Sequence, residues 1–148
     1  MKERSPRLAV RAILMAEDRL LLVNAYSGGR SDLWCAPGGG ARAGQSLPDN
    51  LRREIHEETG LSIEVGAPCL VNEFHDPKTG FHQVEVFFRC TLVAGQLRAD
   101  WKDPEGVVTD RRFFTRAECA QIRIKPSSLA EVAWSDTVVY DPLELIQR

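Results

Sequence analysis

One segment near the middle of the chain carries a full set of start and stop signals for an α-helix, and it constrains the fold more than any other part. Ser46 is a favoured N-cap residue, and Asp49 three positions later fits a capping-box pattern. Pro48 falls in the first turn, where a missing N–H costs little. Gly60 can end the helix in a left-handed conformation. These signals predict a helix over residues 47–59.

Segments rich in β-forming residues flank this helix on both sides. Leu51 and Ile55 lie four residues apart, so they share one helix face that can pack against a sheet. Strands on both sides of one long helix predict an α/β (or α+β) fold in a single domain over residues 1–148. The expected strands are residues 8–16, 20–25, 62–74, 84–93 and 112–114, and two short helices are expected over 115–122 and 127–134.

Composition narrows the class of protein. Lys and Arg number 19 and Asp and Glu number 21, a balance that argues against a nucleic-acid coat with a broadly basic surface. No apolar run approaches the ~20 residues of a membrane helix. The N-terminal stretch alternates apolar residues with others and contains Arg11, so it favours a strand over a signal peptide. We therefore expect a soluble, cytoplasmic protein that does not enter a membrane.

The cysteines carry no metal-site signature. No pair has the C-x-x-C spacing of a structural zinc site. Without a secretory signal, all four are expected to be reduced residues of the core. They are Cys35, Cys69, Cys90 and Cys119.

Three glutamates at the end of the predicted helix are arranged unfavourably unless something binds them. Glu54, Glu57 and Glu58 follow i, i+3, i+4 spacing and therefore project from one side. Like charges at this spacing cost ~0.2–0.5 kcal/mol per pair, and acids at a helix C-terminus lose ~0.3–1 kcal/mol more. Mg²⁺ or Mn²⁺, which prefer oxygen ligands, would reverse both effects. The alternative is a solvated acidic helix end neutralised by Arg52 and Arg53.

The region from Gly39 to Leu61 resembles the Nudix box, G-x5-E-x7-R-E-U-x-E-E-x-G-U, in which U is a bulky aliphatic residue. The lead-in from Leu33 to Gly39 also resembles the W-x-x-P-G-G pattern common in that family. One defined position departs, because Gln45 stands where the family has its first Glu. The matching positions are Gly39, Arg53, Glu54, Ile55, Glu57, Glu58, Gly60 and Leu61.

This resemblance implies a Nudix α/β/α sandwich with a mixed β-sheet, and Mg²⁺- or Mn²⁺-dependent hydrolysis of a nucleoside diphosphate linked to another moiety. By position, Glu57 and Glu58 correspond to principal metal ligands, and Glu54 to a further ligand or to the base that activates water. Arg53 corresponds to the residue that orients the glutamates, and Gly39 to the source of a backbone carbonyl for the metal.

The resemblance has two further implications, one for a residue outside the box and one for the position at which this sequence departs from it. Some family members draw another carboxylate from a later loop, and Glu105 is our choice for it, with Asp103 and Asp110 behind. The glutamate that Gln45 replaces supports the box by pairing with Arg53. Gln keeps the length and can accept a hydrogen bond but lacks the charge, so we expect a tuned or weakened site.

The substrate stays open at this level. A nucleoside triphosphate, oxidised or not, and ADP-ribose are the alternatives. Arg30 is a candidate phosphate contact. Four aromatic residues are candidates to stack on a base, with packing as the alternative for each: Trp34, Phe74, Phe81 and Trp101.

Three other hypotheses complete the expectations. The Gln45 departure motivates a catalytically weak, Nudix-like nucleotide-binding or sensor domain. Action on the 5′ end of RNA is less favoured, because it calls for a basic surface that the balanced charge does not suggest. A homodimer can form through the N-terminal strand or through residues 138–140. The expected binding partner, implied by the resemblance, is a small nucleotide.

Overall fold

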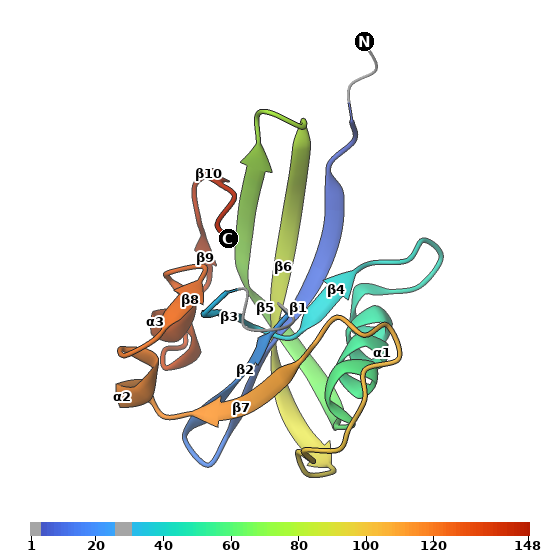
Figure 1. The fold of residues 1–148 in the computed structure, drawn as a ribbon, viewed down its shortest axis with the longest axis vertical. Coiled ribbons are helices and arrows are strands. Elements are labelled where there is room, and N and C mark those ends of the chain that lie inside the picture. The colour runs from blue at the N-terminus through green and yellow to red at the C-terminus, as the bar shows by residue number, and fades with distance from the viewer. Residues whose placement is uncertain (1–3, 26–30) are drawn as a thin grey trace.

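The computed structural model describes residues 4–25 and 31–148, in which a curled mixed β-sheet is covered by helices on both faces (Figure 1). The helix α1 (Leu47–Thr59) covers one face, and α2 (Arg116–Cys119) and α3 (Leu129–Ala133) lie on the other. This arrangement confirms the predicted α/β/α sandwich. The strands are β1 (Arg7–Ala16), β2 (Arg19–Asn24), β3 (Leu33–Cys35), β4 (Gly38–Gly40), β5 (Ser62–Asp76), β6 (Phe81–Ala94), β7 (Asp110–Phe114), β8 (Arg123–Lys125), β9 (Val139–Tyr140) and β10 (Glu144–Leu145).

β1 is the strand on which the sheet divides. It runs parallel to β6 along most of its length, and β6 forms a long antiparallel hairpin with β5. The first half of β1 also pairs antiparallel with β4, whereas its last residues pair with β2. β2 continues into a second group of strands that contains β3, β7 and β8. The short strand β4 therefore lies where the two groups meet, beside α1.

The alternation of side chains in β1 builds two cores. Val10 and Leu14 point toward α1, where they pack with Leu51 and Ile55 of the helix, all four fully buried. Ile13 points the other way, into the cluster beneath α2 and α3. Burying one such side chain contributes about 1.5–3 kcal/mol. The predicted apolar face of α1 is thus confirmed as the contact that fixes the helix to the sheet.

α1 begins and ends where its sequence signals place it. The Ser46 hydroxyl accepts a hydrogen bond from the Asp49 N–H at 3.1 Å. Gly60 adopts a left-handed conformation, with φ of 75°, and donates its N–H to the His56 carbonyl. The Asp49 carboxylate accepts from Arg52. The complete capping box occurs instead at α2, between Thr115 and Glu118.

Other expectations need adjustment. The predicted turn over residues 75–80 is shorter, because His75 and Asp76 extend β5 and pair with the start of β6. The glycine run was not expected to form a strand, yet it pairs with β1 as β4. The four cysteines are free and buried, as predicted. None of the helices in the described residues is both long enough and apolar enough to cross a bilayer.

Candidate active site

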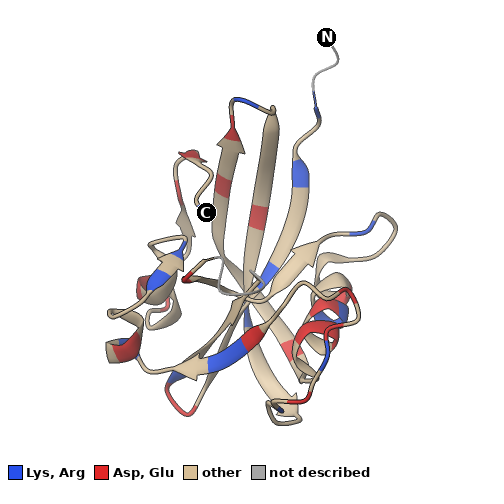
Figure 2. Ribbon diagram, viewed as in Figure 1, with Lys and Arg blue, Asp and Glu red and all other residues tan. Residues whose placement is uncertain are grey.

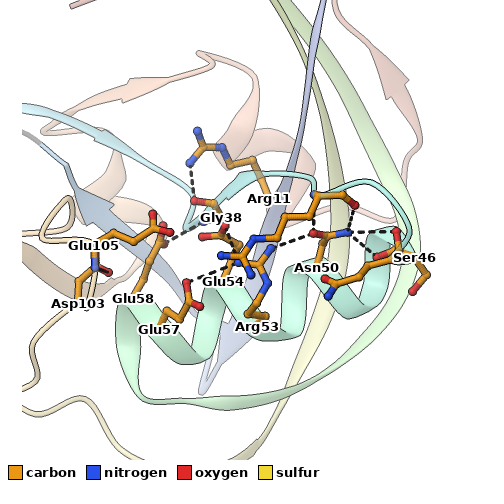
Figure 3. Close-up of polar contacts among 12 residues, drawn as sticks. Arg11, Gly38, Ser46, Asn50, Arg53, Glu54, Glu57, Glu58, Asp103 and Glu105 are labelled. Carbon is orange, nitrogen blue, oxygen red and sulfur yellow. Dashed lines mark hydrogen bonds and ion pairs between the residues drawn. The ribbon is translucent and has the colours of Figure 1, made fainter.

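The three glutamates of α1 border the core, as their spacing predicts. Glu54 and Glu58 are only 6% and 7% exposed, and Glu57 is partly exposed. Figure 2 shows acidic and basic residues together on α1, and Figure 3 shows the three glutamates beside Arg53. Glu54 and Glu58 line a cavity of about 310 Å³, together with the glycines of β4 and Glu105.

The glycines let the β4 backbone lie directly against these carboxylates. The Gly38 N–H donates to Glu58 Oε2 at 3.0 Å. A Cβ atom at Gly39 would lie 2.8 Å from the Glu54 carboxyl group, closer than real side-chain contacts. Any larger residue at Gly39 would therefore displace Glu54 or the strand.

Arg53 contacts two of the carboxylates from within the same helix. Its guanidinium donates to Glu54 Oε1 at 3.1 Å and lies 3.6 Å from Glu57 Oε2. It also donates to Asn50 Oδ1 at 2.9 Å. Gln45 takes a different part from the expected one, since its contribution is a backbone carbonyl that accepts from the Asn50 side chain. Asn50 reaches Arg53 because it lies one helical turn earlier.

Two buried atoms of this cluster lack a hydrogen-bond partner among the described residues: Arg53 Nε and Glu57 Oε2. An unsatisfied buried oxygen costs about 1–3 kcal/mol, more when it is charged. No three acidic, histidine or cysteine side chains in the described chain are grouped tightly enough to form a ready-made ion site. The donor set nonetheless suits a hard divalent cation, which would give the Glu57 oxygen its missing partner.

Burial governs the protonation of the carboxylates. It raises the pKa of Glu58 to about 8, against the opposing effects of Arg11 and of the Gly38 N–H. Burial also raises the pKa of Glu54, although the hydrogen bond from Arg53 opposes it. Charge repulsion from Glu105, which lines the same cavity, adds to the rise in the pKa of Glu54. Without a bound cation, Glu58 is largely protonated at neutral pH.

Of the three acids considered in the later loop, the structure brings Glu105 to the cavity. Asp103 is buried and serves the backbone, because its carboxylate accepts from the N–H groups of Glu105, Val107 and Val108 at 3.0 Å each. Asp110 lies 3.9 Å from Arg112 in a surface ion pair. Asp103 therefore shapes the turn that presents Glu105.

A group of cations also lines the cavity, and the sequence analysis did not single it out. The group consists of Arg7, Arg11, Arg42 and Lys125. Arg7 donates to Gln83, and its guanidinium packs so closely on Gly40 that a Cβ there would lie 2.5 Å from Nη2. The one visible signal was Arg11, a charged residue inside an apolar strand.

Arg11 is part of a buried ion pair. It contacts Glu85 of the neighbouring strand β6, and it donates to the carbonyls of Ala36 at 3.1 Å and Gly38 at 3.4 Å. Burial lowers the pKa of Arg11, but the charges of Glu85, Cys35 and Glu58, together with the hydrogen bond to Glu85, outweigh it and leave the pKa above its usual range. Arg11 thus keeps its charge and holds the chain on either side of Pro37.

The proposed substrate contacts are dispersed. Trp34 is buried in the core, edge-on to Phe114 at 4.9 Å, and is not among the residues lining the cavity. Phe74 lies in a small adjoining pocket with Lys125 Nζ 5.7 Å from its ring centre. Arg30 lies outside the described residues. Trp101 packs on the end of α1.

Comparison with known proteins assigns the family. The model of the NUDIX domain matches residues 5–134, and the chain therefore belongs to the NUDIX domain family. A curated ADP-ribose pyrophosphatase from Methanocaldococcus jannaschii is 28% identical over 68% of this chain and 60% of its own length. The crystal structure of a MutT NUDIX hydrolase from Burkholderia pseudomallei superposes with a TM-score of 0.74 at 20% identity, covering 89% of this chain and all of that one.

These likenesses differ in reach. The chain spans 44% and 60% of the length of two curated relatives that it matches. A second structural relative, a UDP-X diphosphatase, has a TM-score of 0.72 at 23% identity, with 97% of this chain and 69% of that chain covered. At such identities the structural matches establish the shared fold, and the choice of substrate has to come from the site itself.

Proposed function

We propose that this protein hydrolyses a pyrophosphate bond in a nucleoside diphosphate linked to another moiety, with Mg²⁺ or Mn²⁺ as cofactor. The observation that carries the proposal is a cavity lined by two kinds of charged group. Buried carboxylates of α1 form one group (the α1 side), and cationic side chains form the other (the cationic side). A diphosphate bridged to the carboxylates by a divalent cation would satisfy both sides at once.

Each residue of the α1 side has a distinct part in this proposal. Glu57 and Glu58 would hold the cation, with Glu54 as a further ligand and the Gly39 backbone alongside. A cation bound there would neutralise phosphate charge and lower the pKa of a coordinated water. Arg53 keeps Glu54 and Glu57 in place through its hydrogen bond and ion pair.

Glu105 is the proposed proton acceptor for the attacking water, with Glu54 as the alternative. It lines the cavity together with Glu54 and Glu58 and is solvent-exposed, so water can reach it. A general base must lie within reach of the proton that it removes and must be ionised. The buried Glu58 meets the second condition only when a cation displaces its proton.

The cationic side would hold the phosphates that the metal does not contact. Arg7 is fixed by Gln83 and by its packing on Gly40, so its guanidinium is set in place before a ligand arrives. Lys125 lines both the cavity and the small pocket that contains Phe74. ADP-ribose, named for the Methanocaldococcus relative, and nucleoside triphosphates are the substrate classes to compare.

A hydrolysis screen tests the proposal. Nucleoside di- and triphosphates, ADP-ribose and dinucleoside polyphosphates are incubated with the protein in Mg²⁺ or Mn²⁺, and phosphate-containing products are measured. Glu57→Gln should abolish the activity, and Glu64→Gln, an exposed carboxylate of β5, is the matched control. Unchanged turnover in Glu57→Gln would contradict the assignment of Glu57.

One observation supports a second candidate, a sensor that binds nucleotide without turnover. Gln45 stands where the Nudix box has a Glu, and Arg53 Nε is buried without a hydrogen-bond partner among the described residues. Calorimetry with ADP-ribose separates the candidates. Tight binding without product release in either metal would favour the sensor.

A further inference from the structure

The last turn of α1 is closed by side chains from a distant loop. The His56 carbonyl accepts from the Gly60 N–H, within the helix's own cap. The Glu57 carbonyl accepts from Trp101 Nε1 at 2.9 Å, and the Glu58 carbonyl accepts from Arg111 Nε. Two of the backbone acceptors that a helix end leaves open are thus satisfied from outside the helix. These two backbone carbonyls belong to Glu57 and Glu58, whose side chains border the active site.

The indole of Trp101 is locked in place by packing as well as by its hydrogen bond. A Cβ atom on Gly60 would come within 2.8 Å of the indole ring, so the ring lies directly against the helix end. The His56 ring meets it edge-on, with centroids 5.6 Å apart and planes at 80°. The position of the Trp101 ring is therefore defined by its packing against Gly60 and His56 at the end of α1.

Trp101 and Arg111 bracket the loop that carries Glu105. Between them, the Asp103 carboxylate accepts three backbone N–H groups and folds the loop into a turn. Past that turn, the Thr109 N–H donates to the Asn24 carbonyl at 2.9 Å. The turn is therefore held at both ends and from within, and Glu105 is directed into the cavity (Figure 3).

Docking this loop also offsets an electrostatic cost. The C-terminus of a helix carries partial negative charge, and α1 places three glutamates near it. The Trp101 N–H brings the positive end of a dipole to this helix end, and the Arg111 guanidinium brings a full positive charge. The same contacts that place Glu105 thus make the acidic helix end tolerable.

We propose that Trp101 and Arg111 are positioning residues that hold the Glu105 loop against α1, so that Glu105 and the α1 glutamates act on the same substrate. The proposal rests on the proposed function, in which Glu105 accepts a proton at the active site. Neither residue touches substrate, and both act through Glu105.

A double-mutant cycle tests this coupling. Trp101→Phe keeps an aromatic ring on Gly60 but removes the N–H donor. In the wild-type background it should lower kcat about tenfold and leave KM within about twofold. In a Glu105→Gln background it should lower kcat less than about twofold, because the group that it positions is already gone. Lys102→Ala, an exposed neighbour on the same loop, should change neither.

Mn²⁺ affinity, measured by calorimetry, gives a readout that needs no turnover. Glu105 adds negative charge to the cavity, so Trp101→Phe should weaken Mn²⁺ binding about threefold with Glu105 present and not in Glu105→Gln. Arg111→Lys keeps the charge without the Nε–H and should follow the same pattern. Circular dichroism confirms that each variant is folded.

The outcomes distinguish the two hypotheses. Equal losses of Mn²⁺ affinity in both backgrounds would mean that Trp101 only stabilises the helix, and would overturn the positioning proposal. Wild-type protein that turns over none of the substrates but shows the coupled loss of Mn²⁺ affinity would overturn the proposed function and support the positioning.

Discussion

The two sides of the cavity are both charged and partly buried, yet they are built in opposite ways. On the cationic side, Arg11 is paired with Glu85 and donates to two carbonyls, so its charge is matched within the protein. On the α1 side, Glu58 is buried, accepts a hydrogen bond from the Gly38 N–H and has a pKa raised to about 8. The charge of Arg11 is thus matched by Glu85, whereas the effect of burial on Glu58 exceeds the opposing charge of Arg11.

This difference separates structural charge from functional charge. Removing one member of a buried ion pair strands the other and costs about 3–5 kcal/mol. Removing a buried carboxylate whose desolvation cost exceeds the attraction of its counter-charge relieves the protein of that cost. Substitutions on the two sides should therefore change stability in opposite directions.

The largest effect is expected for Arg11→Met. It leaves Glu85 buried without its cation, so the free energy of unfolding should fall by about 3–5 kcal/mol. Urea denaturation at neutral pH measures the change. The matched control is Arg98→Met, which removes an exposed pair with Asp100 and should have no resolvable effect. A loss below about 1 kcal/mol for Arg11→Met would erase the distinction between the two sides.

Glu58→Gln tests the other side. The amide oxygen can still accept from the Gly38 N–H, but the negative charge for a metal is lost. We expect metal-dependent kcat/KM to fall at least about a hundredfold, because both cation affinity and charge neutralisation suffer. The melting temperature of the metal-free protein should rise by about 3 °C at pH 8. A variant that is both less active and less stable would contradict the view that the burial of Glu58 serves function at a cost in stability.

The pH dependence of stability sharpens the comparison further. The pKa of Glu58 is about 8 in the folded protein against 4.5 for an ordinary glutamate. The contribution of the protonated group is therefore complete below about pH 4.5 and is lost as the pH rises through about 8. Metal-free protein should melt about 5 °C lower at pH 9 than at pH 6. Glu58→Gln should flatten this slope, and Mg²⁺ at pH 9 should restore the wild-type melting temperature.

The smallest effect is expected for Gln45→Glu, which returns the carboxylate that the Nudix box carries. Arg53 Nε is buried without a hydrogen-bond partner in the described part of the chain, and a charged acceptor nearby would favour it. We expect a two- to fivefold gain in kcat/KM, equivalent to about 0.4–1 kcal/mol. Gln45→Ala serves as the comparison. Identical rates for the Glu and Ala variants would show that Asn50 alone suffices to hold Arg53.

The sequence predicted local features well. The bounds of α1 followed from Ser46, Gly60 and the Leu51–Ile55 spacing, because caps and helix faces depend on residues within about four positions. The side-by-side glutamates followed from the same spacing. The glycine run, in contrast, has no side-chain pattern that signals a strand, so β4 was missed.

Contacts between distant residues were out of reach. Arg11 and Glu85 are 74 residues apart, and Trp101 contacts a carbonyl 44 residues earlier. Such pairs depend on which strands become neighbours and on how a loop returns. Neither is encoded in a short window of residues. The same limit applies to Trp34, which was a candidate for stacking on a base. Its side chain instead packs in the core.

The sequence by itself determined that a capped helix presents three carboxylates from one side, because helical geometry translates spacing directly into direction. Only the tertiary structure decided that two of these carboxylates are buried and that cations and Glu105 line the same cavity. Burial and counter-charge are set by segments brought together from across the chain. The common direction of the glutamates is thus determined by their local spacing, whereas their pKa values and partners depend on the whole folded protein.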